Sequence, residues 1–548
     1  MIVADAVADT LVRLGVAEVF GLVGSSNFLL TNALVSRGAR FVSSRHEGGA
    51  MAMADGFTRT AARLPVVSLH HGNGLTNAMT GLVEAVKSHT PMLVLVPEAR
   101  ASGRDSSFYI DQAALVHAAG AELHVITSPQ NAVREAARAY RRAAFDGATV
   151  VLNLPLAVLD APAVDEPIRA LPAPTPAAPA PDAVQRLKDL LEASHRPVFI
   201  AGRGARSAGP SLRQLAADTG ALLATSVAAR GLFAGDAWEL DVSGGFSTPE
   251  TAQLLAEADL IVAFGASLNV WTSRDGAIFG EDATVVQVDR DPAALGRQPR
   301  VDLLVCADVG ETARAVSAVL DGVGPRYRTP DVGRRIVEGA HWRDVPYEDE
   351  GRDGRIDPRT LSLALDELLP LERVVCTDIG NHSSYPMLFM RLPDASGLCA
   401  PIGFVSVGLG LGSAIGAAVA RPDRQVVACV GDGGLLMSAS ELETVVRERI
   451  PLLVVVYDDH AYGAESLQFG PDGHSLDTVV FPDADLAAVA RGYGWEGITV
   501  REPGDLEAVA AWLAGARTSP MLVDAKIASF PSFVLAHMAK LSGHSPSH

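Results

Sequence analysis

Cysteine is scarce in this sequence, and no two cysteines have the CxxC spacing. The four cysteines, at positions 306, 376, 399 and 429, are too few to staple a chain of 548 residues, and their spacing does not suit a thiolate metal site. This usage favours a reducing compartment, so we expect a cytoplasmic protein.

Long apolar runs and clusters of basic residues are missing too. No stretch reaches about 18 uncharged apolar residues, and the start "MIVADAVADT" carries no basic residue, so we expect neither membrane insertion nor export. Lys and Arg number 45 against 64 Asp and Glu, for a net charge of −19, and no Lys/Arg-rich run occurs. Nucleic acid is therefore not an expected partner.

The composition is that of a globular enzyme, with 48% hydrophobic and 20% charged residues. At roughly 150 residues per domain the length predicts three or four domains, and we take three. The proline-rich stretch 161–182 and the polar stretch 322–358 are interpreted as linkers. The expected domains are then 1–165, 183–322 and 355–535.

Short β-branched runs alternate with Ala/Leu-rich segments of helical spacing in each of these domains. Runs such as "TPMLVLV", "DLIVAFG" and "PLLVVVYDD" have no polar alternation, which is typical of strands covered by helices on both faces. The expected fold class is α/β, with three doubly wound parallel-sheet domains. Ligands of such sheets bind at the carboxyl ends of the strands.

Two stretches at expected strand ends combine glycine and aspartate: "VGDGGLLMS" at 430–438 and "VVVYDDHAYG" at 454–463. Either stretch alone is equally compatible with a simple turn. A right-handed crossover between the two strands would bring Asp432 and Asp459 close to one ion. Two carboxylates suit a hard cation such as Mg²⁺, which commonly bridges to a diphosphate.

The glycines beside Asp432 fit the same interpretation. Gly431, Gly433 and Gly434 have no side chains, so backbone N–H groups there can approach phosphate oxygens at a helix N-terminus. The sequence therefore predicts a metal-bridged diphosphate at this place.

In this order and spacing the two stretches resemble the signature of the thiamine-diphosphate-dependent enzymes. The resemblance implies thiamine diphosphate and Mg²⁺ as cofactors, with Asp432, Asp459 and the carbonyl group of Ala461 as metal ligands. It also implies that the first domain binds the pyrimidine ring of the cofactor, that the second is the central domain of the family, and that the third binds the diphosphate. Asp458-Asp459 replaces the family's Asn-Asn. An extra carboxylate repels a diphosphate unless a cation neutralises it, so we expect an unusually steep dependence on the divalent ion.

The stretch "FVSSRHEGGAMAMADGF" resembles the family's Arg-His-Glu segment. The resemblance implies that the carboxyl group of Glu47 bonds the aminopyrimidine ring and promotes loss of the thiazolium C2 proton. The alternative is a solvated glutamate at a helix N-terminus. The following "GNGLTN" resembles a family loop that ends in Asn77, a candidate for cofactor binding.

Three polar residues are candidates for contact with the substrate. A histidine at the position of His70 occurs in the benzoylformate decarboxylase branch and could shuttle protons, whereas a hydrogen-bonded loop histidine is the alternative. His71 is a weaker candidate. Ser25 and Ser26 could donate to a substrate carboxylate or form an ST-turn. A glutamine that many relatives carry near position 107 is missing, unless Gln112 substitutes for it.

The third domain offers further candidates. "CTDIGNHSSYPM" resembles the loop that touches the diphosphate, which implies cofactor contacts from Asn381 and His382, although Asn381 could instead cap a helix. "GFVSVGLGLG" resembles the segment that bends the cofactor. Val407 would lie between its two rings, and the carbonyl group of Val405 would accept from its amino group. A core valine at position 407 is the alternative.

FAD is not expected in the central domain, but it stays possible. "FIAGRGARSAG" offers Gly202 and Gly204, a weak dinucleotide signal that helix packing explains equally well. The FAD-contacting segment of acetolactate synthases is represented here only by "GASLNVWTSRDG" at 265–276, which keeps little of it.

The resemblance implies an enzyme that decarboxylates a small 2-oxo acid and then protonates or transfers the acyl unit, as acetolactate synthases do. Benzoylformate decarboxylase-like and benzaldehyde lyase-like C–C cleavage are alternatives. A non-catalytic cofactor-binding subunit and a nicotinamide dehydrogenase are alternatives of other classes. The resemblance also implies a homodimer or homotetramer with active sites at subunit interfaces.

Overall fold

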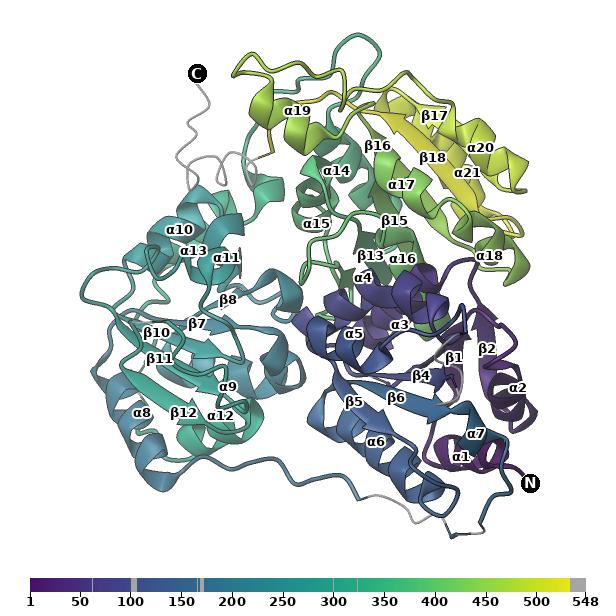
Figure 1. Ribbon diagram of the computed structural model, residues 1–548. Coiled ribbons are helices and arrows are strands. Elements are labelled where there is room, and N and C mark those ends of the chain that lie inside the picture. Colours follow the sequence, from purple (N-terminus) through teal and green to yellow (C-terminus); the bar gives the residue numbers. More distant parts are fainter. Residues whose placement is uncertain are drawn as a thin grey trace.

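The computed structural model describes residues 1–61, 63–99, 106–164, 166–167, 172–298, 300–322 and 324–532. Three six-stranded sheets form the framework, one after another along the chain, and helices cover their faces (Figure 1). All strand pairings within the three sheets are parallel. The expected α/β class with three parallel-sheet domains is confirmed.

The first and third sheets share one strand order. The first has the order β2-β1-β3-β4-β6-β5 and the third β14-β13-β15-β16-β18-β17. The strands of the first are β1 (Glu18–Gly21), β2 (Arg40–Ser43), β3 (Val66–Ser68), β4 (Met92–Glu98), β5 (Glu122–Val125) and β6 (Thr149–Pro155). Those of the third are β13 (Arg373–Thr377), β14 (Leu398–Cys399), β15 (Gln425–Gly431), β16 (Leu453–Asp458), β17 (Glu496–Val500) and β18 (Met521–Lys526).

The central sheet has the order β12-β11-β10-β7-β8-β9, which is the arrangement of Rossmann-type domains. Its strands are β7 (Pro197–Ala201), β8 (Leu222–Thr225), β9 (Glu239–Val242), β10 (Leu260–Phe264), β11 (Thr284–Asp289) and β12 (Leu303–Cys306). The three sheets lie inside the three expected domains, whose exact boundaries stay a prediction.

The helices follow the strands as the alternating pattern predicts. In the first domain they are α1 (Val3–Arg13), α2 (Phe28–Ser36), α3 (Glu47–Ala61), α4 (Asn73–Lys87), α5 (Gln112–Ala119), α6 (Ala132–Asp146) and α7 (Leu156–Leu159). In the central part they are α8 (Pro181–Ala193), α9 (Gly209–Thr219), α10 (Pro249–Ala256), α11 (Val270–Ser273), α12 (Val309–Ser317) and α13 (Pro330–Gly339). In the third domain they are α14 (Pro358–Leu368), α15 (Ser384–Phe389), α16 (Gly410–Ala420), α17 (Asp432–Ser438), α18 (Glu441–Arg447), α19 (Gly463–Phe469), α20 (Leu486–Gly492) and α21 (Glu507–Ala514). Among the described residues, no helix is long and apolar enough to cross a membrane.

One expected linker is not a simple linker. The stretch 322–358 contains α13, which packs Val332 and Ile336 against the central domain. The side chain of Thr329 caps this helix by accepting from the N–H group of Val332. The Thr-Pro pair at the helix start is a helix signal that the linker interpretation overlooked.

The first and third domains pack through α3 and α16, which lie side by side in Figure 1. Their contact depends on glycines. A Cβ atom at Gly56 would lie 2.1 Å from the carbonyl oxygen of Ser413, and one at Gly416 would lie 1.8 Å from that of Met53. Backbone atoms occupy the space of the missing side chains, so these positions tolerate no larger residue.

Replacing Gly416 with alanine should therefore separate the two helices. Although alanine favours helix formation, the clash with the backbone of Met53 forces a shift, and overpacking of this kind typically costs about 1–3 kcal/mol. We expect a lower thermal midpoint than for wild type, measured by calorimetry. The matched control is Gly492→Ala, at a glycine with open space around it. A Gly416→Ala midpoint equal to that of the control would contradict this packing.

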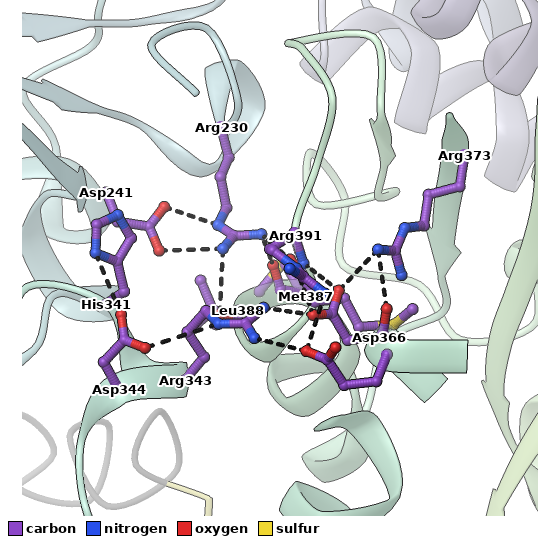
Figure 2. Close-up of polar contacts among 12 residues, drawn as sticks. Arg230, Asp241, His341, Arg343, Asp344, Asp366, Arg373, Met387, Leu388 and Arg391 are labelled. Carbon is purple, nitrogen blue, oxygen red and sulfur yellow. Dashed lines mark hydrogen bonds and ion pairs between the residues drawn. The ribbon is translucent and has the colours of Figure 1, made fainter. Parts of the chain in front are cut away.

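A buried arginine joins the central domain to the third domain (Figure 2). Arg230 pairs with Asp241 at 2.8 Å. It also donates to the carbonyl oxygens of Met387 at 2.9 Å, Leu388 at 3.2 Å and Met390 at 2.8 Å. These carbonyl groups lie at the C-terminal end of α15, where a cation is favoured. The contact therefore fixes the central domain against a helix that begins next to the expected diphosphate loop.

The neighbouring strand β9 carries a buried glutamate. Burial, with a contribution from Asp241, raises the pKa of Glu239 from 4.5 to about 8. Between these pH values the unfolded chain has lost the proton that the folded chain keeps. The contribution of Glu239 to the free energy of unfolding is therefore fully present below about pH 4.5. It falls as pH rises towards 8, by up to about 1.4 kcal/mol per pH unit.

The variant Glu239→Gln should remove this loss. We expect its free energy of unfolding to exceed that of wild type by a few kcal/mol at pH 8 and to match it near pH 4.5. Urea titrations at the two pH values measure the difference, and Glu496→Gln at an exposed position is the control. A free energy of unfolding for Glu239→Gln at pH 8 no higher than that of Glu496→Gln would show that the charge of Glu239 is not responsible.

Candidate active site

The two expected metal-binding aspartates lie at the carboxyl ends of neighbouring strands. Asp432 begins α17 directly after β15, and Asp459 directly follows β16, which pairs with β15. Burial, together with the nearby carboxylates of Asp458 and Asp459, raises the pKa of Asp432 to about 7. Burial also raises the pKa of Asp459 to about 6. Two half-buried carboxylates with raised pKa values are suited to bind a divalent cation, which would favour their ionised forms.

The turn after β16 holds Asp459 in place. The hydroxyl group of Ser529 donates to Asp459 Oδ2 at 3.1 Å, and the backbone N–H group of Ala461 also donates to this carboxylate. His460, between them, has a left-handed backbone with φ of 60°. The local arrangement fits a ligand role for Asp459 and Ala461, and that role stays a prediction.

The glycines around Asp432 have close neighbours. A Cβ atom would lie 3.1 Å from the ring of His382 at Gly431, 2.8 Å from the ring of Tyr462 at Gly433, and 2.2 Å from Asp378 Oδ2 at Gly434. Packing alone therefore requires small residues here. Phosphate binding by their N–H groups is compatible with these contacts and stays a prediction.

His382 is buried directly beside Gly431. Burial lowers its pKa to about 4, and its ring donates to the carbonyl oxygen of Cys429. Its Nε2 atom has no hydrogen-bond partner among the described residues. An unpaired buried nitrogen fits a ligand that supplies the missing contact, because such groups are costly when left unsatisfied. The expected contact with the diphosphate is chemically reasonable, since an anion beside the ring would favour its protonated form.

The side chain of Asn381, expected to contact the diphosphate, forms hydrogen bonds with the backbone instead. Its amide nitrogen donates to the carbonyl oxygen of Phe530 at 2.9 Å, and its amide oxygen accepts from the N–H group of Ser532 at 2.9 Å. The N-cap residue of the short helix 381–383 is Gly380, so Asn381 is not the cap of this helix. In this arrangement Asn381 anchors the segment that follows β18, and a diphosphate contact stays a prediction.

Sequence reasoning overlooked Asp378, which organises the loop expected to bend the cofactor. It is fully buried, and burial raises its pKa to about 6. Its carboxylate accepts from the N–H group of Gly408 at 2.9 Å. The signal was its position directly after β13, in the motif that also supplied Asn381 and His382.

The loop itself exposes the two valines of interest. Val405 has a φ of 62°, which is unusual for a β-branched residue, and it is 53% exposed. Val407 is 39% exposed, so the alternative that it is a core valine is wrong. A strained backbone and exposed apolar side chains favour a functional loop.

Glu47 lies at the start of α3 and is buried, so the alternative of a solvated glutamate is wrong. The side-chain amide of Asn77 donates to Glu47 Oε2 at 3.0 Å. Asn77 thus orients the carboxyl group on which the expected chemistry depends. Among the described residues of one chain, no recorded contact joins Glu47 to Asp432.

His70 and His71 stack on each other with ring centroids 4.3 Å apart. His70 Nδ1 lies 2.8 Å from the carbonyl oxygen of His71. Since a carbonyl oxygen can only accept, Nδ1 carries the proton and Nε2 is left as the basic atom in the neutral ring. Burial, followed by the neighbouring His70, lowers the pKa of His71.

The two serines lie at the carboxyl edge of the first sheet. Ser26 Oγ accepts from the N–H group of His71 at 3.2 Å. Ser25 and Ser26 line a pocket of about 230 Å³ together with His71 and several leucines. Gln112 does not take over a substrate contact, because its amide bonds Gly72, Pro97 and Asn153 in the domain interior.

The glycine pair of the central domain, Gly202 and Gly204, packs against the loop at Gly265. The N–H group of Gly204 donates to the carbonyl oxygen of Gly265 at 3.0 Å. A Cβ atom at Gly202 would lie 2.2 Å from the same oxygen. The backbone donor of Gly204, which would approach a pyrophosphate, is thus bonded to the opposite loop. This geometry favours the packing interpretation of the glycine pair.

Comparison with protein-family models finds three matches along the chain. Residues 1–127 match the thiamine pyrophosphate enzyme N-terminal TPP binding domain, residues 184–316 the central domain, and residues 378–525 the C-terminal TPP binding domain. The order is the one that the motifs predict.

Several curated proteins are similar over most of their length. The probable 2-ketoarginine decarboxylase AruI of Pseudomonas aeruginosa is 30% identical, with 92% of this chain and 89% of that protein covered. The acetolactate synthase large subunit of Parasynechococcus marenigrum is 29% identical, with 94% and 86% covered. The sulfoacetaldehyde acetyltransferase of Rhodobacter capsulatus is 28% identical, with 91% and 90% covered.

Among solved structures, the thiamine diphosphate-dependent 4-hydroxybenzoylformate decarboxylase of Rhodococcus jostii superposes with a TM-score of 0.81 at 22% identity, covering 97% of this chain and 99% of that one. This likeness shows a shared fold. The three domain matches and the full-length relatives show more: the chain belongs to the thiamine-diphosphate-dependent enzymes.

Proposed function

We propose that the protein is a thiamine-diphosphate- and Mg²⁺-dependent 2-oxo acid decarboxylase and carboligase of the acetolactate synthase type. The observation that carries the metal and diphosphate part is the half-buried pair Asp432 and Asp459 at adjacent strand ends, with raised pKa values. Both carboxyl groups have raised pKa values in the absence of a cation. The proposed ligands are these two carboxylates and the carbonyl group of Ala461.

Thiamine diphosphate would supply the nucleophilic carbon and the electron sink for decarboxylation. The residues of the chain would hold and position it. Glu47, oriented by Asn77, would exchange a proton with the aminopyrimidine ring. The diphosphate would bind beside His382 and the glycines of α17. Val407 and the carbonyl group of Val405 would set the angle between the two rings.

The substrate side of the site would be formed by the first domain. Ser25 and Ser26 would donate hydrogen bonds to the carboxylate of the 2-oxo acid. The free Nε2 atom of His70 would accept or return a proton at the reacting carbon. A basic histidine at this place also supports a second candidate, a decarboxylase or C–C lyase that ends in protonation rather than acyl transfer.

Two subunits would be needed for a complete site. Exposed apolar side chains surround the proposed cofactor site, namely Phe404, Val405, Val407, Leu436, Met437 and Tyr462. Another subunit that covers this surface would bring its own Glu47 towards Asp432, so we propose a homodimer or homotetramer. A cytoplasmic location agrees with four free cysteines, of which three are buried. FAD is not part of the proposal.

NMR analysis of products would test the reaction. Purified protein is incubated with pyruvate, thiamine diphosphate and Mg²⁺, beside a control without the cofactor. Cofactor-dependent acetolactate is the expected product, whereas acetaldehyde alone would favour the decarboxylase alternative. If pyruvate is untouched, the same assay with aromatic, branched and cationic 2-oxo acids decides the substrate class, and a lack of turnover with all of them would contradict the proposal.

A further inference from the structure

The extra carboxylate beside the proposed metal site has a buried partner that the sequence did not reveal. Asp458 is the last residue of β16, and its register partner on the parallel strand β18 is Lys526. Lys526 Nζ lies 2.6 Å from Asp458 Oδ2. Asp458 and Lys526 are 1% and 3% exposed, so water screens this ion pair very little.

The ammonium group of Lys526 fills a cluster that would otherwise suit a cation. Asp458, His460 and Asp483 offer atoms within 4.8 Å of one another. Lys526 Nζ also lies 2.8 Å from Asp483 Oδ1, 3.0 Å from Asp524 Oδ2 and 2.9 Å from the carbonyl oxygen of Ala484. These contacts use all the N–H donors of the Lys526 ammonium group. The lysine thus occupies the position that a metal cation would take in this cluster.

The other oxygen of Asp458 shapes the turn that carries the proposed ligands. Asp458 Oδ1 accepts from the N–H group of His460 at 3.0 Å. Arg355 donates to His460 Nδ1 at 3.0 Å and holds the ring from the other side. The left-handed residue His460 is thereby fixed between Asp459 and Ala461.

We propose that Asp458 and Lys526 form a positioning pair for the metal-binding turn. Lys526 neutralises the carboxylate that stands where the family signature has asparagine, and it holds Oδ2 of that carboxylate through a charge-assisted hydrogen bond. Asp458 in turn fixes the backbone that presents Asp459 and Ala461. This inference rests on the proposed binding of thiamine diphosphate and a divalent cation.

The pair also changes the expectation of an unusually steep divalent dependence. That expectation assumed that only the bound cation could neutralise the additional carboxylate. Because Lys526 already pairs with Asp458, the bound cation is not the only charge that can neutralise this carboxylate.

The inference gives a distinctive pattern for two variants. In Lys526→Met, the unpaired carboxylate of Asp458 repels the diphosphate, so we expect the dissociation constant of thiamine diphosphate at saturating Mn²⁺ to rise at least about tenfold. Adding Asp458→Asn removes that charge and keeps an oxygen that accepts from His460. The double variant should therefore bind thiamine diphosphate within about threefold of wild type.

Calorimetric titration with thiamine diphosphate and electron paramagnetic resonance of bound Mn²⁺ measure these affinities without turnover, and circular dichroism verifies folding. Lys188→Met is the matched control, because Lys188 pairs with Glu192 on α8 in the central domain. Weak binding in both Lys526→Met and the double variant would overturn the inference, as would unchanged binding in Lys526→Met. If wild type binds neither ligand, the proposed function itself fails, and this inference falls with it.

Discussion

Replacing Glu47 with glutamine is expected to lower kcat/KM for the 2-oxo acid by about 10²–10⁴-fold, the usual contribution of a positioned acid–base group. Glutamine has the same shape and can still bond Asn77, but it cannot exchange a proton with the aminopyrimidine ring. The buried setting of Glu47 limits replacement by water. We therefore expect lost turnover with nearly unchanged stability.

Two further measurements and a control variant make this result specific. Deuterium exchange at the C2 carbon of bound thiamine diphosphate should slow in Glu47→Gln, while the affinity for the cofactor changes by less than about tenfold. The control Glu135→Gln removes a surface carboxylate that bonds Thr127, and it should behave like wild type. Wild-type rates of exchange and turnover in Glu47→Gln would rule out the proposed role.

The fold and the outline of the site could be predicted because their signals are local. Unbroken apolar runs indicated strands covered on both faces, and the Gly-Asp-Gly motif lies directly after one of them. Asp432 and Asp459 are distant in sequence, but one crossover relates them, and β15 and β16 are indeed neighbours. Resemblance to a family then supplied Glu47, which no periodicity could have identified.

The residues that were overlooked depend on tertiary contacts. Asp378 contacts a loop that is about thirty residues away, at Gly408. Lys526 contacts Asp458 only because β18 lies beside β16 in the sheet. No turn joins these two parallel strands directly, so the sequence does not indicate their register. Similarly, nothing in the sequence shows that the amide of Asn381 is bonded to the backbone at Phe530 and Ser532.

Tertiary contacts also change two interpretations that were made from the sequence. The glycines near Asp432 were assigned to phosphate binding, yet the contacts with His382, Tyr462 and Asp378 would require small residues even without a ligand. The additional carboxylate of Asp458 suggested an excess of negative charge at the metal site, whereas the structure pairs it with Lys526. In both cases the residue type was noticed correctly, but its neighbours decide what it does.

Replacing Asp432 with asparagine should separate cation binding from the stability of the empty protein. In the absence of a cation, burial and the neighbouring carboxylates raise the pKa of Asp432 from 3.8 to about 7. The stability that this group contributes is present at low pH and is lost as pH rises through 7, by up to roughly 4 kcal/mol. Without ligands at pH 8, Asp432→Asn should therefore melt at a higher temperature than wild type.

The order should reverse when Mg²⁺ and thiamine diphosphate are added. Wild type gains stability from the ligands, because a cation favours the ionised carboxylates and bridges them to the diphosphate. Asp432→Asn lacks one charged ligand, so we expect at least about a hundredfold weaker Mg²⁺-dependent cofactor binding, from the loss of about 3 kcal/mol of charge-assisted interaction. Thermal melts at pH 8 with and without ligands measure both effects, and Asp423→Asn at an exposed pair with Arg421 is the control. A ligand-induced rise in melting temperature as large in Asp432→Asn as in wild type would show that Asp432 does not bind the metal.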